Sequence, residues 1–176
     1  RQSRLLSLGG RDSLGARDDV WQMRTEQGGL WLPLPTQGGP PPARWNHVAV
    51  MDTLRNRVIV HGGRNEDGLL GDLWALDLGD TACWREIPAS GDVPSPREGH
   101  VGAIDLGRDV LLIHGGADGA LCDDLYMLSL SEPPQWWRVT AGGDKPAPRR
   151  DHTLILDTPR RRMILFGGDG QAGPLD

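Results

Sequence analysis

The stretch Arg97–Trp137 holds one complete copy of a unit that the rest of the sequence repeats. It reads R-E-G-H at 97–100, L-L-I-H-G-G at 111–116 and D-L-Y-M-L-S-L at 124–130, and it ends at the tryptophan. Its diglycine recurs at 9–10, 62–63, 115–116 and 167–168, in steps of 53, 53 and 52 residues. Three more markers keep this period: Arg-x-x-His at 44–47, 97–100 and 149–152, Asp-apolar-aromatic at 19–21, 72–74 and 124–126, and tryptophan at 31, 84 and 137. Four markers in a fixed order indicate an internal repeat.

A repeat of this length, with a diglycine after an apolar run and a late tryptophan, resembles the kelch repeat of β-propeller proteins. The segment G-D-V-P-S-P-R-E-G-H at 91–100 resembles the longer kelch variant, which also occurs in the galactose-oxidase-like branch. The resemblance covers all 176 residues. It implies an all-β fold, namely a partial kelch-type β-propeller built of four-stranded antiparallel blades.

The markers divide the chain into four units. Residues 44–96 and 97–148 are predicted to form complete blades, and 1–43 and 149–176 to supply parts of two others. Propellers typically close with about 4 to 8 blades, so we expect the chain to be a fragment of a longer propeller. The alternative is self-association, in which open sheet edges pair with a second copy.

Composition narrows the expected partners. With 25 Gly and 14 Pro, the chain turns often and helices should not dominate. The net charge of -5 gives no electrostatic basis for binding a phosphate backbone, so no nucleic-acid partner is expected. No apolar run has the length of a membrane span, so no membrane partner is expected. Cys83 and Cys122 occupy different places in the repeat and form no disulfide framework, which favours a cytoplasmic location.

The tryptophans of the predicted outer strands are expected to fill the space between sheets, because large aromatic side chains bury much apolar area. These residues are Trp31, Trp84 and Trp137. Trp45 lies outside the repeating set and is expected to be more exposed. An aromatic ligand site is the alternative interpretation.

Histidines begin the predicted inner strands at His47, His100 and His152. Three such side chains could converge on a zinc or copper ion. A residue present in every unit is more often a packing or hydrogen-bonding device of the fold, and we favour that interpretation. His61 and His114 stand where other copies have leucine or phenylalanine, so packing is predicted for them as well.

Repeated arginines and aspartates of opposite charge lie near the predicted strand ends. We expect Arg44, Arg97 and Arg149 to pair with Asp19, Asp72 and Asp124 and so to tie each blade to the next. The alternative is that the arginines face solvent and bind a partner. The arginine run 160–162 could form an anion site, but a solvated hairpin turn is the favoured interpretation.

The galactose-oxidase-like branch supplies the enzyme hypothesis, because the resemblance implies copper held by histidines and tyrosines. Tyr126 is the only tyrosine of this sequence, so that chemistry would need residues outside the chain. No nucleophile elbow, phosphate loop or zinc-protease motif occurs. We therefore predict no catalytic residues, no metal and no cofactor. The alternative function is a galactose-oxidase-like or carbohydrate-active propeller with its catalytic residues elsewhere.

The kelch resemblance implies a non-catalytic protein-interaction scaffold that binds through loops on one propeller face. The loops that follow strand two and precede strand one differ most between copies, so the fold does not dictate their residues. G-G-R-N at 62–65 resembles a partner-contacting loop of some kelch adaptors, and a guanidinium with an amide can clamp an acidic peptide segment. The predicted binding residues are Arg64, Asn65, Asp67, Arg44, Asn46, Arg97, Asp118, Arg150 and Asp169.

Overall fold

The chain is described by a computed structural model that covers residues 4–25 and 28–176. This part of the chain folds into β-strands and contains no α-helix. A 3₁₀ turn, η2 (Thr158–Arg160), lies in one hairpin. No helix within the described residues is long and apolar enough to cross a membrane. The predicted all-β class is confirmed.

The longer strands form antiparallel sheets in chain order. The first sheet contains β1 (Arg4–Asp12), β2 (Gly15–Arg24) and β3 (Leu30–Pro33). The second contains β5 (Val48–Asp52), β6 (Arg57–Arg64), β7 (Leu69–Leu78) and β8 (Ala82–Glu86). The third contains β10 (Val101–Asp105), β11 (Val110–His114), β12 (Leu125–Ser129) and β13 (Gln135–Arg138). The chain continues with the hairpin β14 (Thr153–Asp157) and β15 (Arg162–Phe166) and with the short pair β16 (Asp169–Gly170) and β17 (Gly173–Pro174).

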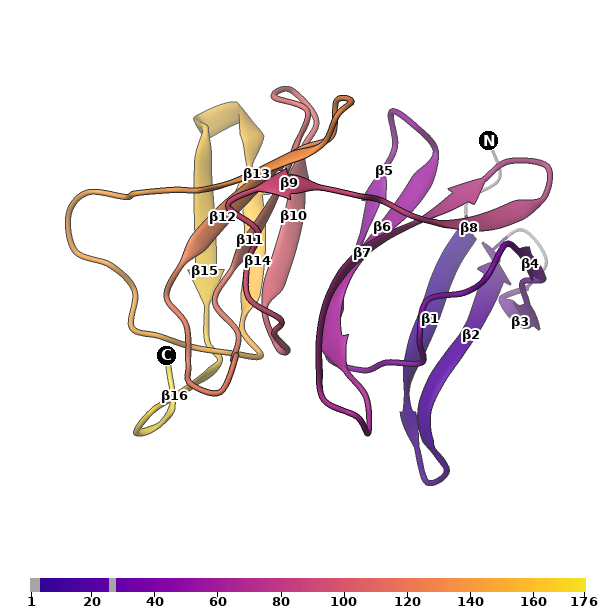
Figure 1. Cartoon of the computed structure of the whole chain (residues 1–176), viewed down its shortest axis with the longest axis horizontal. Helices are drawn as coiled ribbons and strands as arrows, with labels where there is room; N and C mark the ends of the chain where they lie inside the picture. The colour runs from indigo at the N-terminus through magenta and orange to yellow at the C-terminus, as the bar shows by residue number, and fades with distance from the viewer. Residues whose placement is uncertain (1–3, 26–27) are drawn as a thin grey trace.

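The sheets follow one another across the molecule in chain order, from β1–β3 through β5–β8 and β10–β13 to β14–β15 (Figure 1). The first strands of successive units are neighbours, because β10 contacts both β5 and β14. Adjacent blades of a propeller are arranged in this way around the propeller axis.

Each of the second and third sheets has one further short strand, which comes from the unit that precedes it in the sequence. β4 (Thr36–Gln37) pairs in parallel with β8, and β9 (Ser90–Gly91) pairs in parallel with β13. Figure 1 shows β9 crossing beside β13 at the outer edge of the third sheet. Residues 36–37 and 90–91 precede the units predicted to begin at 44 and 97, yet they complete the sheets of those following units.

The apolar core lies between the sheets. One cluster joins the second and third sheets, with Ile59 and Ala75 on one side and Leu128 and Trp136 on the other. A second cluster packs Val20 of the first sheet with residues of β6–β8, including Trp84. Strand two of each complete unit is buried along nearly its whole length, as expected of a strand covered on both faces.

The expected burial of the outer-strand tryptophans is correct for Trp84 alone. Trp31 and Trp137 remain 41% and 38% exposed, whereas Trp136 is 3% exposed. The register explains the exposure of Trp137, because Trp84 pairs with Leu76 and Trp136 pairs with the equivalent Leu128. Trp31 pairs with Met23, which is equivalent to Leu76, so its exposure does not come from a shift of register. A shift of one residue along a strand moves a side chain to the other face of the sheet. Trp137 therefore points away from the core, and Trp136 is the repeating tryptophan.

The arginines of Arg-x-x-His tie neighbouring sheets, but their carboxylate partners differ from those predicted. The backbone of Arg97 belongs to the second sheet, since Gly63 donates its N–H to the Arg97 carbonyl at 2.8 Å. Its guanidinium binds Asp124 at 2.6 Å and the Gly115 carbonyl at 3.0 Å, both in the third unit. Arg44 likewise binds Asp72, not Asp19. Arg44 and Arg97 thus each pair with the aspartate of their own unit, whereas the guanidinium of Arg149 donates to the carbonyls of Ala147 and Gly167.

Histidines pair across the junctions between sheets. His61 Nδ1 lies 3.0 Å from His100 Nε2, and His114 Nδ1 lies 3.0 Å from His152 Nε2. Burial lowers the pKa of His61 to about 3, and burial, with the nearby positive charge of Arg44, lowers that of His47 to about 4. His100 and His152 are therefore hydrogen-bonding partners inside the fold, as the favoured interpretation predicted, and they bond to His61 and His114, for which packing was predicted.

Candidate functional site: a loop surface with a pocket

The loops that enter strand one and leave strand two lie together at one end of the sheets. Isolated bridges pair the two loops in each unit, namely Trp45 with Arg64, Glu98 with Ala117, and Arg150 with Asp169. We call this end of the molecule the loop surface. It brings together residues that are about 20 positions apart in the sequence, because both loops meet at the same end of the strand one–strand two hairpin.

Glu98 connects the second and third units on the loop surface. Its Oε1 accepts a hydrogen bond from Arg64 Nη1 at 2.8 Å, and its Oε2 accepts one from Asn46 Nδ2 at 2.9 Å. Glu98 is buried, and a buried carboxylate that accepts two donors has a fixed orientation. This network holds the predicted binding residues Arg64 and Asn46 in defined positions.

Trp45 supports the arginines of the loop surface. The guanidinium carbon of Arg11 lies 4.7 Å from the centre of the Trp45 ring, and that of Arg64 lies 5.7 Å away. Cations at such distances from an indole are attracted to its ring. Trp45 is half-buried, so it is more exposed than Trp84, but the expectation that it is more exposed than Trp31 and Trp137 is wrong.

A pocket of about 580 Å³ opens between the loops of the three units. Arg64, Glu98, Arg150 and Asp169 supply its charged groups. The rest of the wall comes from small or apolar residues, including Leu69, Ala117 and Leu121. Three of the predicted binding residues therefore line one concave site, and Asp169 comes from the unit after that of Glu98.

Acidic groups beside this pocket influence one another. Burial raises the pKa of Asp151, although the neighbouring Arg150 opposes the shift, and the negative charges of Asp169 and Glu98 act in the same direction as burial. Arg150 Nε lies 3.5 Å from Asp151 Oδ2, and its side chain is 44% exposed. The pocket therefore presents mixed charge, with Arg64 and Arg150 as its exposed cations.

The remaining predicted binding residues take different roles. The Asn65 side-chain oxygen accepts the N–H groups of Asp67 and Gly68, which shapes the turn after β6. Asp67 is exposed beside it. Asp118 accepts a 2.6 Å hydrogen bond from the Ser95 hydroxyl, which lowers the pKa of Asp118. These three residues lie on the loop surface but outside the pocket lining.

Arg44 and Arg97 do not belong to the loop surface as contact residues. Both side chains are buried, 3% and 1% exposed, and both guanidinium groups bind the aspartate of their own unit. We therefore remove them from the candidate site. Glu98 and Trp45 take their place, and sequence reasoning missed them because it selected cations and amides for an acidic partner.

Donor groups for a metal ion are not gathered in the described residues. Within 4–25 and 28–176, no group of three or more His, Cys, Asp or Glu side chains is placed to hold one. Burial raises the pKa of Cys122 to about 11, so this thiol is protonated at neutral pH.

Successive antiparallel sheets with a pocket built from their connecting loops define a repeat protein of the β-propeller class. The sequence of the chain matches the KLHDC2/KLHL20/DRC7 Kelch-repeats domain over residues 1–173. The chain therefore belongs to the kelch-repeat family, as its four markers indicated.

Proteins with different names contain a similar segment. Acyl-CoA-binding domain-containing protein 4 of Arabidopsis thaliana is 33% identical over 172 residues, which is 97% of this chain and 25% of that protein. Acyl-CoA-binding domain-containing protein 5 of the same plant is 35% identical over 144 residues, 81% of this chain and 22% of that protein. Adagio-like protein 1 of Oryza sativa subsp. japonica is 33% identical over 138 residues, 77% of this chain and 21% of that protein. The chain spans about a quarter of the length of these relatives or less.

Proposed function

We propose that the chain is a non-catalytic protein-interaction scaffold, and that its partner binds the pocket of the loop surface. Kelch repeats generally mediate protein–protein interaction, which supports the general role. The observation that carries the specific proposal is the pocket of about 580 Å³ into which loops of three units converge. A concave site with a few placed polar groups is the usual form of a binding site.

The charged groups of the pocket favour a partner segment with acidic side chains. Arg64 is 40% exposed, and Glu98 occupies only part of its guanidinium. Arg150 presents a second exposed guanidinium on the same pocket. Guanidinium groups bind carboxylates with paired, directional hydrogen bonds. Glu98 and Asp169 add selectivity, because they repel a carboxylate that is placed away from the two arginines.

Partner capture with matched charge-reversal variants tests this proposal. The full-length protein is used to isolate partners by affinity capture and mass spectrometry, in parallel with Arg64→Glu and Arg160→Glu. Arg160 lies in the hairpin turn at the opposite end of the sheets and is 70% exposed, so its reversal changes the net charge equally. We expect at least one partner to be lost from Arg64→Glu and retained by Arg160→Glu. If the Arg160 variant alone loses partners while both proteins stay folded, the loop surface is not the binding face.

A further inference from the structure

The turn between strands one and two contains a left-handed residue in each unit. Asn56, Asp109 and Arg161 immediately precede strand two and have φ angles of 50°, 55° and 52°. Asparagine and aspartate adopt this conformation more readily than other non-glycine residues. Arginine is therefore less favourable at this left-handed position than the asparagine or aspartate of the second and third units.

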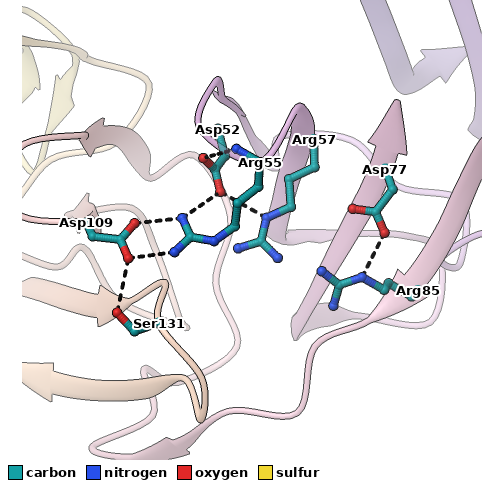
Figure 2. Close-up of polar contacts among 7 residues, drawn as sticks. All are labelled: Asp52, Arg55, Arg57, Asp77, Arg85, Asp109 and Ser131. Atoms are coloured by element: carbon teal, nitrogen blue, oxygen red, sulfur yellow. Dashed lines mark hydrogen bonds and ion pairs between the residues drawn. The ribbon is translucent and has the colours of Figure 1, made fainter. Parts of the chain in front are cut away.

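At the junction between the second and third sheets, this position closes an ion pair. Arg55 donates from Nη1 and Nη2 to the two carboxylate oxygens of Asp109, at 2.7 and 2.6 Å. Ser131 donates its hydroxyl to the same carboxylate at 3.0 Å. Figure 2 shows Arg55 extended between Asp52 of its own turn and Asp109 of the next one. The two turns are thus joined by opposite charges.

The next junction has arginine on both sides. Arg108 occupies the position of Arg55, since each lies three residues after the aspartate that ends strand one and forms an ion pair with it. Arg161 occupies the position of Asp109. Two guanidinium groups cannot form the pair that Arg55 and Asp109 form, and both arginines line a cleft of about 370 Å³ together with the apolar side chains of Leu112, Leu125 and Met127.

The cleft has an excess of positive charge. Arg108, Arg161 and Arg162 line it together with a single acidic residue, Asp105. Asp157 accepts from Arg160 and Arg162, and within the described part of the chain no carboxylate is paired with Arg161. Arg108 lies 3.8 Å from Asp105 and is 54% exposed. The cleft therefore has two guanidinium groups available, one on each turn.

We propose that this cleft binds a phosphate monoester between Arg108 and Arg161, in the place that the Asp109 carboxylate takes at the preceding junction. A phosphate monoester carries about two negative charges at neutral pH, which matches the charge excess of the lining. Its three terminal oxygens accept from two guanidinium forks at once. The site lies at the hairpin-turn end of the sheets, away from the pocket of the loop surface.

Thermal unfolding of the full-length protein in sodium phosphate and in sodium chloride of equal ionic strength tests the site. A ligand that binds the native state raises Tm, so we expect a higher Tm of the wild-type protein in phosphate. Arg161→Asp should lose this rise and weaken phosphate binding about tenfold or more. Because it recreates the Arg55–Asp109 pair, Arg161→Asp should also have a higher Tm than wild type in chloride.

Matched variants separate the site from a general effect of charge. Arg160→Asp makes the same charge change in the same turn outside the cleft and should keep the rise in phosphate. Arg161→Asn places the residue type of Asn56 at the left-handed position, so it should fold and also lose the rise. An equal rise in wild type, Arg161→Asn and Arg160→Asp would overturn the proposal, as would no rise in wild type.

Calorimetry with a phosphoserine peptide flanked by alanines, with its unphosphorylated form and with inorganic phosphate distinguishes the source of the group. Tighter binding of the phosphopeptide than of phosphate assigns the site to a phosphorylated side chain. Binding of the two phosphorylated probes with equal affinity assigns it to free phosphate. Binding of neither probe, or equal binding of the unphosphorylated peptide, overturns the proposal.

Discussion

The guanidinium of Arg97 binds the carboxylate of Asp124, with Nη1 2.6 Å from Oδ1 and Nη2 3.1 Å from Oδ2. Although burial alone would lower the pKa of Arg97, its hydrogen bond to Asp124 raises it above the ordinary value. The backbone of the same arginine is bonded to the preceding sheet, through Leu70 and Gly63. One residue therefore joins two sheets.

Arg97→Ala should lower the free energy of unfolding by about 3–5 kcal/mol, because it leaves a largely buried carboxylate without its partner. Urea titration measures the change. Arg85→Ala is the control, since its pair with Asp77 is exposed on both sides and should contribute less than about 1 kcal/mol. Similar losses in both variants would show that the Arg97 pair does not hold the sheets together.

Trp136→Ala should cost about 3–5 kcal/mol, as expected when a buried aromatic side chain is truncated. Trp137→Ala removes the same number of atoms from a more exposed site and should cost far less. Chemical unfolding of the two variants gives the comparison. A larger loss for Trp137→Ala would contradict the register of β13.

These tryptophans show where sequence reasoning succeeded and where it failed. The repeat correctly predicted the class of fold and the antiparallel strands. The third unit is one residue shorter than the second between its diglycine and Asp124, so its equivalent tryptophan is 136. The signal for this shift was the spacing of the aspartates, because Asp72 and Asp124 are 52 residues apart whereas Asp19 and Asp72 are 53 apart. Because neighbouring residues of a strand face opposite ways, a one-residue error changed a buried side chain into an exposed one.

The candidate site was less predictable than the fold. The sequence placed the loops near Arg64, Arg150 and Asp169 at one end of the sheets. This follows from the hairpin, because the residues before its first strand lie beside the residues after its second strand. Which arginines are exposed could not be predicted from charge alone. All three arginines have a carboxylate partner within 2.8 Å, but the side chains of Arg44 and Arg97 are 3% and 1% exposed, whereas that of Arg64 is 40% exposed.

His61 should make the protein less stable in acid. Burial lowers its folded-state pKa to about 3, below the unfolded value of about 6.5, so the unfolded state binds the proton first as pH falls. Stability contributed by the neutral ring is present above about pH 6.5 and declines as pH decreases towards the folded pKa. His61→Leu should therefore lose about 2 kcal/mol less stability than wild type between pH 7 and pH 5.

Urea unfolding at the two pH values measures this difference. Leu8 occupies the equivalent position of the first sheet, so leucine fits the local geometry. His61→Leu also leaves the His100 Nε2 atom without its partner, which lowers stability at both pH values. Identical pH dependence in wild type and variant would exclude His61 as a source of acid sensitivity.

Gly116→Ala should be strongly destabilising. Its φ is +91°, and an added Cβ would lie 2.7 Å from the Glu98 carbonyl oxygen and 2.8 Å from the His100 Cβ. Overpacking of this kind typically costs about 1–3 kcal/mol, and the positive φ adds to it. Gly142→Ala is the control, because nothing lies within 4 Å of its added Cβ. Thermal unfolding should show a clear decrease in Tm for the first variant and little change for the second.

The isolated 176-residue chain should self-associate through the β14–β15 hairpin. Ile155, Ile164 and Phe166 share one face of this hairpin and are 62%, 42% and 70% exposed. Such a contiguous apolar face promotes association. Light scattering should give a mass above that of the monomer, and Phe166→Glu should reduce it. Leu54→Glu, in an exposed turn, should have no effect, and a monomeric wild-type chain would refute the prediction.

Strands β4 and β9 have a consequence for dividing the chain experimentally. Ser90 and Gly91 leave the second unit and complete the edge of the third sheet, where they pair in register with Gln135 and Trp136. A fragment that begins at residue 97 would lack this edge and expose the backbone of β13 to solvent. Fragments and circular permutants should instead be cut between β8 and β9, at residues 87–89. The boundary between sequence repeats, at residue 97, is therefore different from the boundary between structural units, at residues 87–89.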